Sequence, residues 1–278
     1  MSDDYTAAVE KAREYYNSED ADNFYYTIWG GEDLHVGIYE HEDEPIFDAS
    51  RRTVQRMASF ARKLDPDTYV LDVGAGYGGA ARWLAHTYGC RVVALNLSEV
   101  ENERNRQMNR EQGVDHLIEV VDGAFEDLPF EDEQFDLVWC EDSFLHSGDR
   151  PRVMREIARV LKPGGDFIFT DPMQADDCPE GVLQPILERI HLETMGTPSF
   201  YRSELEGLGF TLMSFEDHSK QLPRHYGRVL KELKSRESEL KGVVSEAYVE
   251  RMKKGLNHWV EGGNNGYLTW GIFHFRKG

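Results

Sequence analysis

The residues with the clearest chemical potential surround a glycine-rich turn. Residues 69–79 read Tyr-Val-Leu-Asp-Val-Gly-Ala-Gly-Tyr-Gly-Gly, an apolar run that breaks into glycines before a helix-forming stretch. Gly74 and Gly76 can adopt positive φ and let a ligand approach the backbone, and a helix start offers N–H groups to it. We therefore expect a strand, a tight turn containing Ala75 and a helix, together holding a nucleoside-like cofactor.

Two cofactor classes fit this turn. The spacing of Gly74, Gly76 and Gly79 satisfies the dinucleotide fingerprint, so NAD(P) and S-adenosylmethionine are both open. Asp72 favours S-adenosylmethionine, because a carboxylate there can reach the ammonium of the methionine portion and would repel a pyrophosphate.

The next apolar run, residues 91–98, ends in Asn96 and Leu97. A ribose-binding acid is expected at this place in either cofactor class. An amide can also bond a ribose diol, but less strongly than a carboxylate. Asn96 therefore departs from both patterns while still being a candidate for the ribose.

A third run, residues 117–121, leads into Asp122, Gly123, Ala124 and Phe125. An acid at that strand end suits the exocyclic amine of adenine. The backbone N–H groups that follow and the ring of Phe125 are placed to meet the base. This turn is the predicted adenine site.

A fourth run, residues 135–139, is followed by Asp142 and His146, which are four residues apart. On one helix the two side chains would share a face. Structural interpretations stand beside a chemical one: Asp142 also fits a helix N-cap, and His146 fits a hydrogen-bonded histidine at a helix start.

Aromatic residues crowd ahead of the first core strand, at positions 15, 16, 24, 25, 26, 29 and 39. Tyr15 and Tyr16 read as the packing face of an N-terminal helix. Residues 23–39 contain glycines and polar breaks and predict a loop, where large aromatics are less easily explained as core. We interpret this loop as a lid over the cofactor, with the working members Tyr25, Tyr26, Trp29 and His35.

The elements that must position these residues indicate an α/β fold with one large domain. Residues 210–215 read as a sixth strand and residues 267–275 as a seventh, antiparallel and edge-side. Residues 218–265 between them are too long for a hairpin, and residues 228–254 have helical spacing. We predict a helical cap there, N-terminal helices and lid in residues 1–64, and a cofactor-binding core in residues 65–175 of a single domain.

Composition narrows the function classes. The 278 residues carry 51 Asp plus Glu against 31 Lys plus Arg, for a formal net charge of −20. Such a surface repels phosphate backbones and argues against a nucleic-acid partner. An acidic surface with arginine about twice as frequent as lysine is expected of proteins that work in high salt.

Cys90, Cys140 and Cys178 are odd in number and widely spaced, which predicts reduced thiols and no metal site. The first residues are acidic, and no apolar run approaches bilayer-spanning length. We therefore expect a cytoplasmic protein that binds no membrane, and the sequence leaves the oligomeric state open.

The turn at Asp72, the strand ends at Asn96 and Asp122, and the run Leu-Lys-Pro-Gly-Gly at residues 161–165 occur in a fixed order. This order resembles the class I S-adenosylmethionine-dependent methyltransferases over about residues 65–175. The resemblance implies a Rossmann-like sheet of seven strands, the last antiparallel, with S-adenosylmethionine as cofactor. It also implies that the fourth-strand exit, with Asp142 and His146, faces the transferring methyl group.

The aromatic lid, the Asp142 and His146 spacing and the Trp-Gly-aromatic ending resemble the phosphoethanolamine and related small-amine N-methyltransferases. Within that group, residues 25–31, 95–98 and 264–271 look most like the sarcosine/dimethylglycine N-methyltransferases of halophilic microbes, over nearly the whole chain. The resemblance implies methylation of sarcosine and dimethylglycine to glycine betaine. Glycine, phosphoethanolamine or a lipid-like acid as acceptor, and a non-catalytic cofactor-binding module, are the alternatives.

A sulfonium methyl is already activated, so such a protein mainly aligns the acceptor nitrogen and excludes water. The acceptor must present a lone pair. Either a base such as His146 removes its proton, with a pH dependence in the range of histidine, or the site selects the neutral amine. Faces of Tyr25, Tyr26 and Trp29 are expected to stabilise charge on nitrogen by cation–π attraction.

The carboxylate of an amino-acid acceptor needs a cation or an amide fork. The sequence offers four candidates and does not choose among them: Arg189, Arg202, Asn264 and Asn265.

Overall fold

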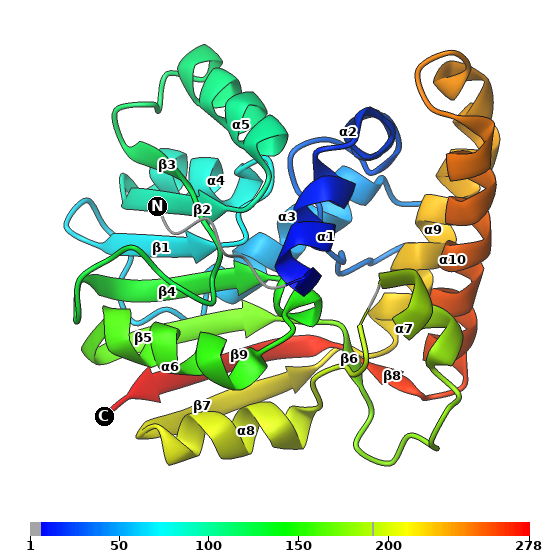
Figure 1. Cartoon of the computed structure of the whole chain (residues 1–278). Coiled ribbons are helices and arrows are strands. Elements are labelled where there is room, and N and C mark those ends of the chain that lie inside the picture. Colours follow the sequence, from blue (N-terminus) through cyan, green and yellow to red (C-terminus); the bar gives the residue numbers. More distant parts are fainter. Residues whose placement is uncertain (1–6, 191) are drawn as a thin grey trace.

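The computed structural model describes residues 7–190 and 192–278 and is built around one twisted seven-stranded sheet (Figure 1). The strand order is β3-β2-β1-β4-β5-β9-β7, in which all strands but β9 run parallel. The strands are β1 (Tyr69–Val73), β2 (Arg91–Asn96), β3 (Ile118–Asp122), β4 (Phe135–Glu141), β5 (Leu161–Thr170), β7 (Phe210–Asp217) and β9 (Gly271–Lys277). The expected α/β class and the antiparallel last strand are confirmed.

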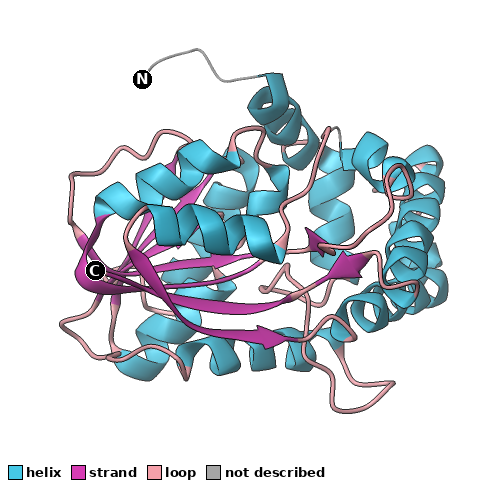
Figure 2. Ribbon diagram, turned by 90° about the horizontal axis from the view of Figure 1, so that it is seen from below, coloured by secondary structure: helices cyan, strands magenta, loops and turns pink. Residues whose placement is uncertain are grey.

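Successive side chains of each strand point to opposite faces, and both faces are buried under helices (Figure 2). On one face Leu137 and Trp139 of β4 join the apolar residues of α3 and α4, whereas Val138 and Cys140 face α6 and α8. The helices of this core are α3 (Ile46–Ala58), α4 (Gly79–Tyr88), α5 (Glu99–Glu111), α6 (Arg150–Val160) and α8 (Pro198–Gly207).

The end of the chain differs from the expectation in one respect. β9 lies between β5 and β7, so the sheet edge is β7 and the edge-side placement of the last strand is wrong. Residues 268 and 269 form a separate strand, β8 (Leu268–Thr269), which pairs with β6 (Met173–Gln174) in a small second sheet. The reason is burial: Ile272, Phe273 and Phe275 are apolar on both faces, as suits an interior strand.

The predicted aromatic loop is partly helical. Residues 23–28 belong to α2 (Glu19–Ile28), which follows α1 (Ala7–Tyr16). The side chain of Ser18 accepts a hydrogen bond from the backbone of Ala21 and caps the helix. Ala21, Phe24 and Ile28 then recur on one buried face, so local capping and a helical apolar period outweigh the polar breaks.

The cap follows β7 and consists of α9 (Gln221–Arg236), a 3₁₀ turn η2 (Glu237–Leu240) and α10 (Glu246–Asn264). The helical stretch predicted over residues 228–254 is therefore two helices, packed side by side (Figure 1). A further helix, α7 (Gln184–Ile190), packs on α10 from outside the predicted insertion.

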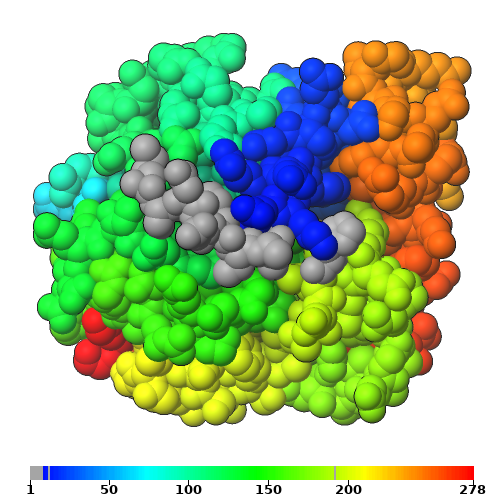
Figure 3. Space-filling view, in the orientation of Figure 1, coloured from blue at the N-terminus to red at the C-terminus, as the bar shows by residue number. Residues whose placement is uncertain are grey.

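In space-filling view α1 and α2 lie between the α5 side of the core and the cap (Figure 3). The parallel strands point their carboxyl ends toward these helices, which is where open α/β sheets bind ligands. No helix of the described residues is long and apolar enough to cross a membrane. The division of the chain at residues 64, 175, 218 and 265 stays a prediction.

Candidate active site

The glycine turn after β1 is tightly built. Gly74 and Gly76 have φ of 75° and 52°, in the left-handed region. A Cβ on Gly74 would lie 2.3 Å from Oγ of Ser143, so only glycine fits against the exit of β4. The N–H groups of Gly74 and Ala75 donate to the carbonyl of Leu95, which ties the turn to β2. The backbone of this turn, which carries no bulky side chain, therefore lines a cavity.

Asp72 lies under this turn and has the character of a cation site. Its side chain is 3% exposed, and its Oδ2 atom has no hydrogen-bond partner among the described residues. Burial, together with the carboxylates of Glu141 and Asp33, raises the pKa of Asp72 well above its usual value. A buried acid without a partner is unfavourable until a cation reaches it, so Asp72 fits the methionine ammonium of S-adenosylmethionine.

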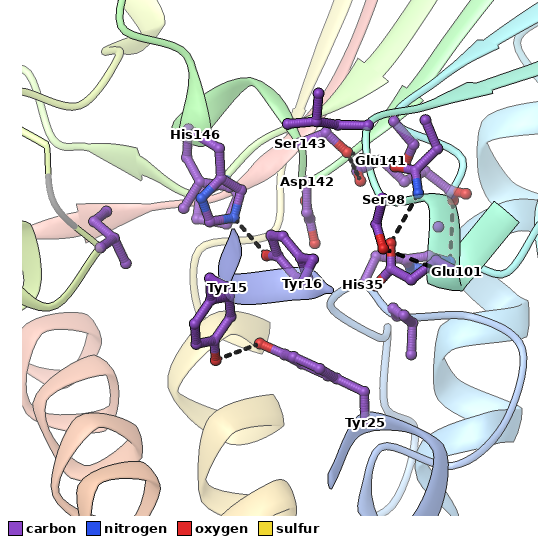
Figure 4. A pocket seen from close by; sticks show the side chains of 18 of the residues that line it. Tyr15, Tyr16, Tyr25, His35, Ser98, Glu101, Glu141, Asp142, Ser143 and His146 are labelled. Atoms are coloured by element: carbon purple, nitrogen blue, oxygen red, sulfur yellow. Dashed lines mark hydrogen bonds and ion pairs between the residues drawn. The ribbon is translucent and has the colours of Figure 1, made fainter. Parts of the chain in front are cut away.

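His35 lies at the same end of the cavity, among acids (Figure 4). Its Nε2 atom is 3.4 Å from Oε1 of Glu141 and 3.9 Å from Oδ1 of Asp33. Burial lowers the pKa of His35, but the carboxylates of Glu141, Asp33 and Asp142 and a hydrogen bond with the carbonyl of Val36 together outweigh burial, and the net shift is upward. These contacts place His35 beside Asp33 and the exit of β4, and its role in the lid stays a prediction.

The ribose position contains an acid that sequence reasoning missed. Nδ2 of Asn96 donates to Oε2 of Glu101 at 2.8 Å, and both residues line the cavity. Glu101 is 4% exposed, and burial raises its pKa to about 7. The pattern Ser98-x-x-Glu101 reads as a helix capping box, and Ser98 does cap α5. That pattern places Glu101 next to the strand end, which is the signal that could have identified it.

The predicted adenine site is only partly assembled. Leu97, Gly123, Ala124 and Phe125 line the cavity. Asp122 is absent from the lining, because its carboxylate accepts hydrogen bonds from Asn102 at 2.9 Å and Arg106 at 2.6 Å. The packing of α5 on β3 turns this acid outward, so a contact between Asp122 and the adenine amine is not supported by this geometry.

Asp142 is neither an N-cap nor the helical neighbour of His146. It has a φ of 53° and stands before the 3₁₀ turn η1 (Phe144–His146). Its Oδ2 accepts from the backbone of Val36 at 2.7 Å, and its Oδ1 accepts from Nε1 of Trp270 at 2.7 Å. Asp142 thus joins the β4 exit to the N-terminal segment and to the end of the chain, and both oxygens are used for that.

His146 is bonded to a tyrosine of the N-terminal helix. Its Nε2 lies 2.8 Å from the hydroxyl of Tyr16, in α1 (Figure 4). Burial lowers the pKa of His146 to about 4, and the charges of Arg150 and Arg189 act in the same direction. The imidazole is therefore neutral near pH 7, and a pH dependence in the ordinary range of histidine is not expected from it.

An aromatic wall stands opposite the sheet and comes from three parts of the chain. Tyr25 and Trp29 have ring centroids 5.1 Å apart, and Tyr226 stacks on Trp259 at 4.9 Å. Trp29 is only 6% exposed but lines the cavity, as do Tyr15 and the other three. These rings form a π-rich end suited to an alkylated amine.

Arg189 is the predicted carboxylate candidate that reaches this wall. It lines the cavity, and Nη2 is 3.1 Å from Sδ of Met252. Within residues 7–190 and 192–278 no carboxylate lies within ion-pair distance of Arg189. A guanidinium beside tyrosines with donors to spare is a ready site for a small carboxylate.

Besides Asp122, four predicted residues are not brought to the cavity. Tyr26 is 52% exposed and lies under the guanidinium of Arg104, 4.2 Å from its ring centroid. Arg202 pairs with Glu206 at 3.2 Å on α8. Asn264 and Asn265 are exposed at the end of α10. Tyr26 departs because successive residues of a helix point about 100° apart, so α2 cannot turn both Tyr25 and Tyr26 inward.

One cavity of about 700 Å³ connects these features, from Asp72 and Glu101 to His146 and Arg189. That volume suits a nucleoside cofactor together with a small acceptor. A parallel sheet with an antiparallel β9, a glycine turn after β1 and a cavity at the strand ends define a class I, S-adenosylmethionine-dependent methyltransferase.

Comparisons with known proteins agree with this class. Residues 71–169 match the methyltransferase domain model. The chain is 73% identical to the sarcosine/dimethylglycine N-methyltransferase of Halorhodospira halochloris, over 98% of this chain and 97% of that protein. It is 54% identical to the enzyme of the same name from Aphanothece halophytica, over 98% of each.

A crystal structure of a protein assigned as a sarcosine dimethylglycine methyltransferase from Galdieria sulphuraria superposes with a TM-score of 0.90 at 42% identity. It covers 95% of this chain and 98% of its own. The chain therefore belongs to the sarcosine/dimethylglycine N-methyltransferase family. The resemblance read from the sequence is confirmed, and so is S-adenosylmethionine as the cofactor class.

Proposed function

We propose that this enzyme methylates sarcosine and dimethylglycine on nitrogen and so completes the osmolyte glycine betaine. The observation that carries the proposal is the acceptor end of the cavity, where the cation Arg189 stands beside an aromatic wall. A betaine has one carboxylate and one quaternary ammonium, and these two features match them. The names of relatives that share 73% and 54% of their residues with the chain support the same substrates.

The cofactor is assigned to the sheet side. Asp72 would receive the methionine ammonium, the Gly74–Gly76 turn would lie along the cofactor, and Asn96 with Glu101 would hold the ribose hydroxyls. Gly123, Ala124 and Phe125 would meet the base. When bound, the cofactor supplies an activated methyl group, whose transfer forms a carbon–nitrogen bond as a carbon–sulfur bond breaks.

The acceptor is assigned to the helical side. Arg189 would bind its carboxylate, while Tyr25 and Trp29 would surround its methylated nitrogen. Cation–π attraction of about 0.5–2 kcal/mol per ring grows as the nitrogen becomes quaternary. Each N-methyl group also buries apolar surface, at about 0.8 kcal/mol per carbon. Glycine lacks these methyl groups, so we expect it to be a poor acceptor.

The neutral amine is the proposed reacting species. His146 is a weak base here, because burial holds its pKa at about 4. Its Nε2 can instead accept a hydrogen bond from the Tyr16 hydroxyl, which leaves the tyrosine oxygen free to accept a hydrogen bond from the N–H of neutral sarcosine. We propose that Tyr16 and His146 align the nitrogen of sarcosine in this way, that the aromatic rings alone position the nitrogen of dimethylglycine, which has no N–H when neutral, and that deprotonation of the acceptor precedes binding.

A product assay tests the function. The purified protein is incubated with S-adenosylmethionine and either glycine, sarcosine, dimethylglycine or phosphoethanolamine, and methylated products are measured by mass spectrometry. We expect turnover of sarcosine and dimethylglycine and little of the other two. Glycine or phosphoethanolamine as the best acceptor would overturn the substrate assignment.

The partners of the enzyme and its location in the cell remain proposals as well. The net charge of −20 supports the prediction that nucleic acid is not a partner, because the protein and a phosphate backbone would repel each other. A cytoplasmic location stays a prediction.

A further inference from the structure

Helix α10 contains a glycine in its interior where helix propensity disfavours one. Gly255 lies near the middle of Glu246–Asn264, and glycine is the least favourable residue there apart from proline. A Cβ built on Gly255 would lie 2.3 Å from Nε, 2.5 Å from Cζ and 2.6 Å from Cδ of Arg189. We infer that Gly255 is a positioning residue: its missing side chain leaves the seat that holds the Arg189 guanidinium at the acceptor end of the cavity.

The other glycines of α10 have different neighbours. Gly262 faces Leu268, and Gly263 faces Pro223. At these two positions the absence of a side chain lets apolar groups pack closely against the cap. Of the three, Gly255 is the one whose space is taken by a charged side chain that lines the cavity.

The seat holds Arg189 from two successive turns of α10. Met252, three residues before Gly255, contacts Nη2 of Arg189 through its sulfur at 3.1 Å. A thioether is a weak acceptor, so the other donors of the guanidinium stay available. Burial raises the pKa values of Tyr16 and Tyr25 well above their usual range, and the positive charge of Arg189 acts against that rise. Arg189, Tyr16, Tyr25 and His146 all line the same cavity.

The position of the guanidinium sets the length of acceptor that the enzyme can align, an inference that rests on the proposed role of Arg189 as carboxylate anchor. The distance from this anchor to the transferring methyl must match the distance from carboxylate to nitrogen in the acceptor. A methyl group at position 255 would displace the guanidinium, and a misplacement of about 1 Å in a reacting complex can lower the rate about 100-fold. Gly255 therefore tunes the site for an α-amino acid.

The test compares Gly255→Ala with a matched variant in the neighbouring helix. A Cβ on Gly227, in α9, would meet only Cγ2 of Val260 at 3.8 Å, an ordinary contact. Alanine is the better helix former at both positions, so neither substitution is expected to unfold the protein. The measurements are the melting temperature, S-adenosylmethionine affinity by calorimetry, and KM and kcat for dimethylglycine.

We expect Gly255→Ala to raise KM for dimethylglycine at least tenfold with unchanged S-adenosylmethionine affinity and no loss of melting temperature. Gly227→Ala should leave all of these values as in the wild type. In the double variant Arg189→Ala/Gly255→Ala, the second substitution should add nothing to the KM of Arg189→Ala alone. Such non-additivity is the mark of action through Arg189 and would not arise from a general effect on α10.

Two results would overturn the inference, and they are distinguishable. If Arg189→Ala raises KM tenfold or more while Gly255→Ala does not, the seat is wrong and the carboxylate anchor stands. If Arg189→Ala leaves KM unchanged while betaine is still formed, the anchor is wrong and the role of Gly255 is lost with it. Absence of betaine formation in the wild type would instead contradict the proposed function itself.

Discussion

The cofactor end of the cavity takes most of its side chains from one run of chain, residues 72–126, whereas the acceptor end takes them from segments far apart in sequence. Asp72 lies near the end of β1, Asn96 is the last residue of β2 and Gly123 follows β3, and the sheet brings these strand ends together. Tyr25, Arg189 and Trp259 share no strand and meet only because α1, α2, α7 and the cap pack on one another.

This difference teaches which part of the site is free to change. A cofactor site at strand ends is set by sheet register, which is strongly specified because a shift of one residue turns every side chain over. An acceptor site between helices is set by packing, so we expect a substitution at a single position such as Gly255 to reshape it. A substitution at one end of the cavity should therefore leave the other end unchanged, as an internal reference.

The largest expected effect is on the acceptor end, through pH. We expect kcat/KM for dimethylglycine to rise about tenfold per pH unit between pH 7 and 9, because the neutral fraction of an aliphatic amine with a pKa of about 10 rises in that way. His146→Ala should lower the rate but keep the slope, since His146 with a pKa of about 4 is already neutral throughout this range. Initial rates across pH for the wild type, His146→Ala and the exposed control His116→Ala test this. A titration step near pH 6.5 in the kcat/KM profile that disappears only in His146→Ala would instead identify His146 as the base.

The cofactor end is tested by Asp72→Asn. Losing a charged hydrogen bond of about 1.5–3 kcal/mol should weaken S-adenosylmethionine binding roughly 10- to 100-fold. Thermal stability should not fall. The pKa of Asp72 is higher in the folded protein than in the unfolded chain, so above the unfolded pKa its ionisation destabilises the folded state. Asparagine does not ionise and removes that cost. Calorimetry on this variant and on the surface control Asp67→Asn measures both. Unchanged affinity in a folded Asp72→Asn protein would remove the ammonium assignment.

A smaller effect is expected at the aromatic wall. Trp29→Phe keeps a ring in a buried position but weakens its π face, so kcat/KM for dimethylglycine should fall about fivefold, within the cation–π range of about 0.5–2 kcal/mol. S-adenosylmethionine affinity should stay as in the wild type. Trp83→Phe, outside the cavity lining, is the control. A lower melting temperature with normal turnover would mean that Trp29 is only core.

The ribose position should show a modest pH effect. Burial raises the pKa of Glu101 to about 7, so its carboxylate forms as pH rises from 6 to 8 and its hydrogen bonds to ribose hydroxyls strengthen. We expect wild-type S-adenosylmethionine affinity to rise about threefold over that range. Glu101→Gln cannot titrate and should lose this increment, as measured by calorimetry at each pH. An equal increment in the variant would assign the effect to another acid of the cavity.

The smallest effect is expected at Tyr26. Its ring packs under Arg104 on the outside of α2, so Tyr26→Ala should leave kcat and KM for dimethylglycine within twofold of the wild type. Steady-state assays beside Tyr25→Phe, its inward neighbour, make the comparison. A tenfold loss of kcat/KM in Tyr26→Ala would contradict this prediction and support a role for Tyr26 in the lid.

The sequence by itself determined the sheet and much of the cofactor turn, because both depend on short-range rules. A buried apolar run, a glycine at positive φ and a capped helix are local features, so Asp72, Gly74 and Gly123 could be named from their neighbours in the chain. Local rules could not predict the hydrogen bonds of Asp122, because its partners Asn102 and Arg106 belong to a helix that only packing brings back to β3.

Only the tertiary structure decided the acceptor end. Arg189, Arg202, Asn264 and Asn265 are equal candidates along the chain, and Tyr25 and Tyr26 differ by one residue. Burial of the apolar face of α2 turns Tyr25 inward and Tyr26 outward, and the packing of α7 on α10 carries Arg189 to the wall. These outcomes depend on which helix faces meet, a long-range property that no local pattern records.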